Sequence, residues 1–124
     1  MIALDSSSLI HYLAGSPGAD VLAVDIALSE SQACLPPVVL SELLSEPRLR
    51  ADVAEVLLQI PLLEIRPGFW ERAGRLRAGV LAKGRKARLA DTLIAQACLD
   101  SKVALITRDL DFRHYKTAGL ELLP

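Results

Sequence analysis

The sequence predicts an α/β domain in which a central parallel sheet is covered by helices on both faces, a three-layer α/β/α sandwich. Short apolar segments of strand length alternate with longer segments of helical periodicity along the 124 residues. Several strand segments are wholly apolar, which is typical of parallel strands buried on both faces. No repeat, low-complexity tract or linker interrupts this pattern, so we expect one domain spanning residues 1–124.

Five segments have the length and composition of buried strands. They are residues 1–4 (MIAL), 33–35 (ACL), 62–65 (LLEI), 103–107 (VALIT) and 120–123 (LELL). The clearest is 103–107, which is short, continuous and rich in β-branched side chains. Pro36 and Pro37 end the second strand, because proline has no N–H to donate to a sheet.

Capping residues, prolines and apolar spacing predict helices between these strands. The expected ranges are 6–14, 19–30, 37–45, 49–60, 67–84 and 90–101. Ser6 or Ser7 is expected to cap the first helix, and Pro37 suits the first turn of the third. Residues 15–18 form a turn rich in glycine, and Pro47 separates the third helix from the fourth.

Composition and charge exclude several classes of protein. Hydrophobic residues make up 52% of the chain, yet no apolar run approaches the ~20 residues of a membrane-spanning helix. No basic segment precedes the first apolar stretch, so a secretory signal is not expected. Cys34 and Cys98 lie far apart without metal-ligand spacing, which fits a reducing cytoplasm. The net charge of −1 excludes a globally basic nucleic-acid binder, so any such contact requires a local patch.

Four acids occupy suggestive positions in this pattern. Asp5 follows the first strand and Asp109 follows VALIT by two residues, and sites in parallel sheets form beyond the carboxyl ends of the strands. Glu42 lies within the helix VVLSELL, and Asp91 opens the helix ADTLIAQA. Each acid alone also has an ordinary explanation. Asp5 and Asp91 suit helix N-caps or first turns, and Glu42 suits a solvated helix face.

As a set, the four acids predict a divalent-metal site. Two carboxylates ~5 Å apart repel by roughly 3 kcal/mol at an effective dielectric constant of about 20. A divalent cation removes that cost, and all-oxygen ligands suit Mg²⁺ or Mn²⁺. Such a cation can lower the pKa of bound water and stabilise charge on a phosphoryl group. The sequence alone does not show that the four acids converge.

The segments around these acids resemble those of the PIN domain family, and most specifically the small VapC-type toxins of bacterial and archaeal toxin–antitoxin pairs. The matching segments are IALDSSSLI, LPPVVLSELL and LADTLIAQACLDSKVALITRDLDF, and residues 15–32 and 47–85 match in pattern only. The metal-binding and catalytic acids implied by the resemblance are Asp5, Glu42, Asp91 and Asp109. The supporting residues that it implies are Ser7, Thr107 and Asp111.

The resemblance implies a PIN-like fold and a cytoplasmic, Mg²⁺- or Mn²⁺-dependent endoribonuclease toxin that hydrolyses RNA phosphodiester bonds. It also implies a homodimer and a cognate antitoxin whose C-terminal segment covers the acidic groove. One alternative is a non-catalytic PIN module that binds RNA or a protein. A phospho-receiver domain is a poorer match because DSSS lacks paired acids, and a haloacid-dehalogenase phosphatase would carry an aspartate where Ser7 stands.

A basic segment, KGRKAR, precedes Asp91. Its charged residues are Lys83, Arg85, Lys86 and Arg88. One interpretation is a solvated loop whose first charge complements a helix C-terminus. The other is a phosphate anchor for RNA beside the metal site, to which Arg108 and Arg113 could contribute.

Overall fold

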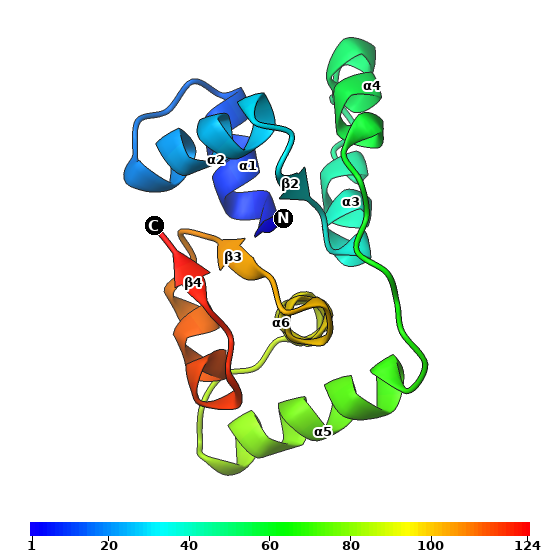
Figure 1. The fold of residues 1–124 in the computed structure, drawn as a ribbon, viewed down its shortest axis with the longest axis vertical. Helices are drawn as coiled ribbons and strands as arrows, with labels where there is room; N and C mark the ends of the chain where they lie inside the picture. Colours follow the sequence, from blue (N-terminus) through cyan, green and yellow to red (C-terminus); the bar gives the residue numbers. More distant parts are fainter.

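The computed structural model describes residues 1–124 and contains a sheet of four parallel strands between layers of helices (Figure 1). The strands, in the spatial order β2-β1-β3-β4, are β2 (Ala33–Cys34), β1 (Ile2–Leu4), β3 (Ala104–Ile106) and β4 (Leu122–Leu123). All three strand pairings are parallel. The predicted fold class, a three-layer α/β/α sandwich with a parallel sheet, is confirmed.

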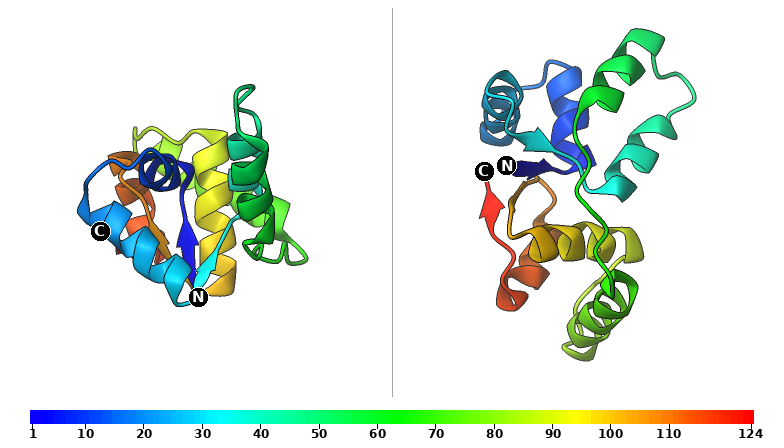
Figure 2. Two further views of the ribbon diagram at one scale, coloured as in Figure 1. Left: turned by 90° about the horizontal axis from the view of Figure 1, so that it is seen from above. Right: turned by 45° about the vertical axis from the view of Figure 1, so that its right-hand side comes forward.

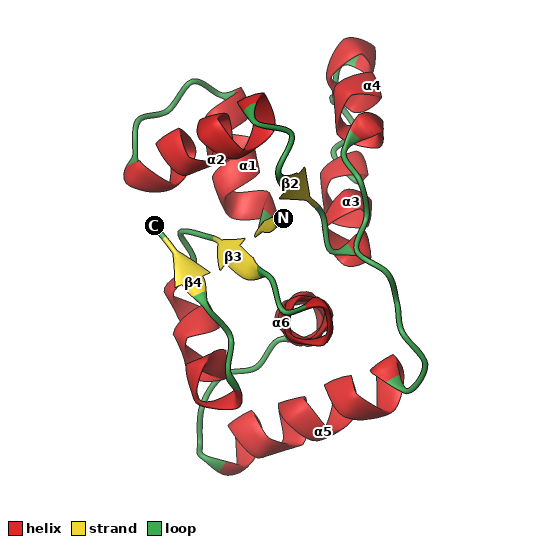
Figure 3. Ribbon diagram, in the orientation of Figure 1, coloured by secondary structure: helices red, strands yellow, loops and turns green.

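Helices cover both faces of this sheet, as the colouring of Figure 3 makes plain. One face is covered by α1 (Ser6–Leu13) and α2 (Ala19–Ser29), and the other by α6 (Leu89–Ser101) and the 3₁₀ helix η1 (Leu110–Ala118). The remaining helices are α3 (Pro37–Leu44), α4 (Ala51–Gln59) and α5 (Phe69–Ala82). The pair α3 and α4 lies beyond the β2 edge, and α5 lies outside α6, away from the sheet (Figure 2). None of the helices is long and apolar enough to cross a membrane.

The register of the central strands brings the ends of β1 and β3 level. Leu4 pairs with Ile106, and the backbone N–H of Asp5 donates to the carbonyl of Ile106 at 2.9 Å. Asp5 and Thr107 therefore leave the sheet side by side, although 102 residues separate them. This is the edge at which ligands bind in parallel sheets.

The core fills the space between the sheet and its helices. Its largest fully buried side chains include Tyr115 and Phe112 of η1 and Leu4 of β1. Two small residues of α6, Ala95 and Cys98, are also fully buried in this core. Cys34 and Cys98 are free thiols, in agreement with the absence of a predicted disulfide.

The predicted strand 62–65 was wrong. Only one parallel bridge forms there, between Leu35 and Leu62, and most of the segment is exposed. The amide of Leu35 donates to the carbonyl of Pro61 at 2.9 Å, and its carbonyl accepts from Leu63 at 2.9 Å. The next donor in a parallel ladder would be the amide of Pro37, which has no N–H, so pairing stops after one residue.

Two further differences concern the ends of β1 and β3. The predicted serine cap was wrong, because α1 begins at Ser6, its N-cap position is Asp5, and no side chain caps the helix there. No helix is predicted between the strands at 103–107 and 120–123, whereas the structure has η1 from Leu110 to Ala118. A 3₁₀ helix has three residues per turn, so the apolar spacing of an α-helix does not reveal it.

Candidate metal centre

An acidic cluster, formed by Asp91, Asp109 and Asp111, lies beyond the carboxyl end of β3. Each contributes a carboxylate oxygen, and these oxygens lie within 4.8 Å of one another. Asp91 is in the first turn of α6, Asp109 is the N-cap of η1, and Asp111 is in its first turn. The carboxylate of Asp109 accepts from the amide of Asp111 at 2.9 Å, which closes the turn and holds both acids together.

Asp5 borders the acidic cluster and is held in one orientation by two hydroxyl groups. Its Oδ2 accepts from Ser7 Oγ at 2.6 Å and from Thr107 Oγ1 at 2.8 Å. Thr107 Oγ1 also accepts from the amide of Asp109 at 3.0 Å, so one hydroxyl links the two acids. Asp5 is only 4% exposed. Its second oxygen, Oδ1, accepts no hydrogen bond, and every fully buried side-chain oxygen of the protein has a partner. Oδ1 is therefore not fully buried and keeps contact with solvent.

Glu42 approaches the same region from α3. Its Oε1 accepts from Ser6 Oγ at 3.2 Å, which ties α3 to the start of α1. Although Glu42 as a residue is exposed, partial burial of its carboxyl raises its pKa, and the negative charge of Asp5 adds to this. Glu42 therefore lies within electrostatic reach of Asp5.

Asp91 is the acid most affected by its neighbours. Burial is the largest cause that raises its pKa, which moves from 3.8 to about 6. The charges of other carboxylates add to the effect, in the order Asp109, Asp5 and Glu42. The guanidinium of Arg88 opposes it. The charges of the other three predicted acids thus all reach Asp91.

The structure places the predicted site residues in three groups. Asp91 and Asp109 lie within the acidic cluster together with Asp111, which the sequence ranked lower as a supporting residue. Asp5 and Glu42 lie outside the 4.8 Å group, but their charges reach Asp91. Ser7 and Thr107 hold the carboxylate of Asp5, as expected for supporting residues.

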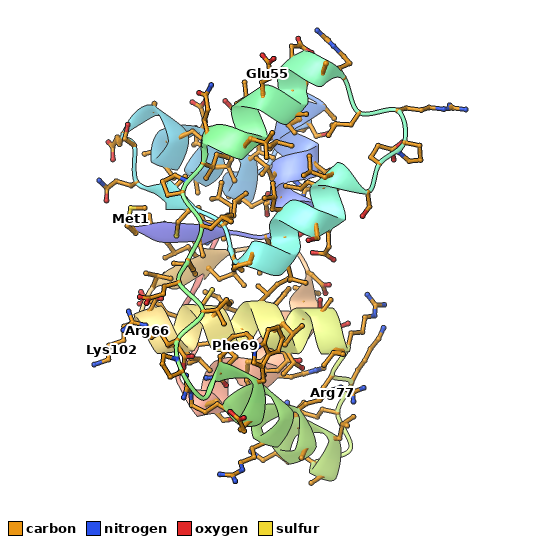
Figure 4. The ribbon with its side chains drawn as sticks, turned by 90° about the vertical axis from the view of Figure 1, so that its right-hand side faces the viewer. Met1, Glu55, Arg66, Phe69, Arg77 and Lys102 are labelled. Carbon is orange, nitrogen blue, oxygen red and sulfur yellow. The ribbon has the colours of Figure 1, made fainter.

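The predicted basic segment lies beside the acidic cluster as an exposed loop. Lys86 Nζ lies 3.6 Å from Asp111 Oδ2, while Arg85 and Arg88 make no side-chain hydrogen bond or ion pair. Arg77 Nε donates to the carbonyl of Ala87 at 2.8 Å and so fixes the loop from α5. In Figure 4, Arg77 points toward the side opposite Arg66.

Arg108, which the sequence places among the possible RNA contacts, is paired with an aspartate within the protein. Its Nε and Nη2 donate to the two carboxylate oxygens of Asp20 at 2.9 and 3.0 Å. Asp20 is 8% exposed and also accepts from the fully buried Ser8 at 2.8 Å. At Gly18 (φ +152°) a Cβ would lie 2.6 Å from Asp20 Oδ1, so only glycine fits beside this ion pair. Nothing in the local sequence indicates this network, which fixes the position of the loop formed by Thr107, Arg108 and Asp109.

In the absence of metal, the protein is expected to lose stability as the pH rises from about 4 to about 6. The folded state binds the Asp91 proton with a pKa of about 6, above the ordinary 3.8, so it holds more protons than the unfolded state in this interval. Asp91→Asn removes this ionisation and should raise the melting temperature at neutral pH. Melting in EDTA across this pH range checks it, with Asp52→Asn on the exposed surface of α4 as the control. Equal pH dependence in Asp91→Asn and wild type would contradict it.

Comparison with known proteins identifies relatives of this fold. The family model described as "PIN domain" matches residues 2–118. No curated protein matches the chain. The chain is similar in fold to solved structures of VapBC2 from Rickettsia felis bound to a promoter DNA fragment (18% identity, TM-score 0.74, covering 99% of this chain and 98% of that one) and of FitAcB from Neisseria gonorrhoeae (19%, 0.73, 100% and 97%).

A third similar structure is VapBC-5 from Mycobacterium tuberculosis, described as a member of the VapBC family of toxin–antitoxin systems (20% identity, TM-score 0.65, covering 98% of this chain and 96% of that one). Nearly the whole length of each chain is covered in all three comparisons. The likeness therefore extends to the complete fold rather than to the sheet alone.

Proposed function

The chain belongs to the PIN domain family, and from that premise we propose that it is a metal-dependent endoribonuclease that acts as the toxin of a toxin–antitoxin pair. The observation that carries the proposal is the acidic cluster at the carboxyl end of β3, with Asp5 and Glu42 beside it. A site of this charge on the ligand-binding edge of a parallel sheet suits a cation and a phosphate ester.

The residues present fit a divalent cation. Every donor is a carboxylate oxygen, which suits Mg²⁺ or Mn²⁺ and does not suit softer metals. The mutual repulsion that raises the pKa of Asp91 is the cost that a bound cation relieves. The proposed ligands are Asp5, Glu42, Asp91 and Asp109, with Asp111 at their side. When bound, the cation would supply an activated water and neutralise charge on the phosphoryl group.

The protein's own residues have separate roles in this proposal. Ser7 and Thr107 donate to the same oxygen of Asp5 and leave the other oxygen without a hydrogen bond, so that it is available to a cation. Ser6 holds Glu42 close to Asp5. The exposed cations of residues 83–88 would bind RNA phosphates and so offset the repulsion between the acidic cluster and the RNA backbone.

Exposed apolar side chains support a protein partner. A hollow of about 550 Å³ between α1, α3 and α4 is lined by Ile10, Leu13 and Val53, and also by Glu42. Ile10 and Leu13 are exposed there. We propose that a cognate antitoxin covers this hollow and the neighbouring acids, by analogy with the VapBC complexes. A homodimer is also proposed, and the exposed Trp70 of α5 suits such an interface.

The proposal is tested by incubating the purified chain with total cellular RNA in Mn²⁺ and in EDTA, and mapping the new RNA ends. Cleavage is expected in Mn²⁺ alone, and Mn²⁺ should also raise the melting temperature, because ligands that bind the folded state stabilise it. Asp109→Asn, prepared in the same way, controls for contaminating nucleases. Absence of both cleavage and a melting shift would contradict the metal-dependent activity and favour a non-catalytic binding module.

A further inference from the structure

We propose that the hollow between α5 and η1 is a phosphate-binding subsite for the RNA backbone, an inference that rests on the proposed ribonuclease function and extends it. The hollow has a volume of about 250 Å³. Its lining residues are Arg75, Leu76, Gly79, Val80, Lys83, His114, Thr117 and Ala118. The lining thus holds two permanent cations, an imidazole and a hydroxyl, and no acid.

The two cations of this subsite have no partner within the protein. Arg75 and Lys83 make no side-chain hydrogen bond and no ion pair, whereas Arg50, Arg72 and Arg108 are each paired bidentately with an aspartate. The chain as a whole has 14 basic and 15 acidic residues, so unpaired cations around a concave surface are not a consequence of a basic composition. Such a surface suits an external anion.

A chain of contacts joins the subsite to the acidic cluster. His114 Nδ1 lies 2.9 Å from the carbonyl of Lys86, which can only accept, so Nδ1 donates and ties the ring of His114 to the basic loop. The Nζ atom of Lys86 in turn lies 3.6 Å from Asp111 Oδ2. An RNA strand with its scissile phosphate at the acidic cluster would pass Lys86 and then reach the hollow.

An ordinary structural role explains only part of this arrangement. Lys83 follows the last residue of α5, where a cation stabilises a helix C-terminus. That role does not account for Arg75, which lies near the middle of α5, nor for the position of His114 on η1. The two explanations predict different results when these cations are replaced. Loss of a helix-end charge should change the melting temperature, whereas loss of a phosphate subsite should weaken RNA binding.

The test measures binding of single-stranded RNA in EDTA, which prevents metal-dependent cleavage, over a range of salt concentrations. The double variant Arg75→Glu/Lys83→Glu should bind an RNA of ~12 nucleotides at least about tenfold more weakly, and its salt dependence should fall by about 0.7 per lost phosphate contact.

The matched control is Arg66→Glu/Lys102→Glu, which makes the same charge change at the end of the molecule opposite Arg77 (Figure 4). If both double variants weaken binding equally, the effect is one of net charge and the subsite is wrong. The subsite is also wrong if wild type binds and cleaves RNA while Arg75→Glu/Lys83→Glu binds with unchanged affinity and salt slope. If wild type neither binds nor cleaves RNA, the proposed function itself fails, and the inference fails with it.

Discussion

Asp5→Asn is expected to lower RNA cleavage by at least about a hundredfold while leaving the protein folded, on the scale of losing one electrostatic group from an active site. Asparagine can place its carbonyl oxygen where Oδ2 now accepts from Ser7 and Thr107. The amide nitrogen then replaces Oδ1, the oxygen that accepts no hydrogen bond and is available to a cation. Amide nitrogen is not a ligand for Mg²⁺ or Mn²⁺, so the site loses a donor and a charge.

The same substitution should not destabilise the metal-free protein. Asp5 occupies the N-cap position of α1 without a side-chain capping bond, so no cap is lost. Removal of its charge also relieves repulsion on Asp91 and Glu42, whose pKa values Asp5 helps to raise. The melting temperature in EDTA should therefore stay constant or rise.

The measurement is cleavage by purified Asp5→Asn and wild type in Mn²⁺, together with melting in EDTA. Asp52→Asn makes the same chemical change on the exposed surface of α4 and should retain full activity. Asp5→Asn with wild-type cleavage and wild-type melting would show that Asp5 only supports the fold. Ser7→Ala leaves the charge of Asp5 in place, so it should reduce cleavage much less than Asp5→Asn.

The sheet and the acids could be predicted because both depend on local sequence. Short apolar strands such as VALIT alternate with helices, and this alternation indicates a parallel sheet. Ligands of such sheets bind beyond the carboxyl ends of the strands. Asp5 and Asp109 were placed at that edge from their distance to β1 and β3 alone. Asp91 was a candidate from its place at the start of a helix, and the motif resemblance strengthened it, because a first-turn aspartate is common in any helix.

The contacts that complete the site could not be predicted, because they join residues distant in the sequence. Asp20 and Arg108 are 88 residues apart, and Ser6 and Glu42 are 36 apart. A local pattern carries no information on which charged side chains meet across such distances. Asp20 lies in the first turn of α2, where an acid is common, but its partner lies in the loop that carries Asp109.

The strand predicted at residues 62–65 failed for a different reason, because its own sequence is suitable but its neighbour cannot pair with it beyond one bridge. Its composition suits a strand, but whether a strand forms depends on the donors of its neighbour. Pro36 and Pro37 remove those donors, so the sheet ends at Leu35 after one bridge. The apolar residues of the segment are left exposed at the edge, with Leu62 48% and Ile65 37% accessible.

Arg108→Met is expected to lower the free energy of unfolding by about 3 kcal/mol, because it leaves a buried carboxylate without its partner. Asp20 would keep only the hydrogen bond from Ser8. The ion pair is strong, since the guanidinium of Arg108 is the main cause that holds the pKa of Asp20 at about 2, against an ordinary 3.8. Denaturant unfolding of the variant and wild type at neutral pH measures the loss.

The pH dependence of this loss has a defined sign. A carboxyl whose pKa is lowered by folding stabilises the protein above its unfolded pKa, and this stabilisation disappears as the pH falls from about 4 to about 2. The stability difference between wild type and Arg108→Met should therefore shrink in this interval. A difference that is constant down to about pH 2 would mean that Arg108 acts through packing of its side chain instead of its charge.

The exposed ion pair of Arg50 and Asp52 provides the matched control, since its side chains are 76% and 63% exposed. Arg50→Met removes the same bidentate type of contact and should change stability by less than about 1 kcal/mol. Adding Asp20→Asn to Arg108→Met removes the unpaired charge and should recover part of the lost stability. If Arg108→Met costs no more than Arg50→Met, the buried pair does not brace the fold. If the double variant regains stability but still cleaves RNA poorly, Arg108 also positions the loop that carries Thr107 and Asp109.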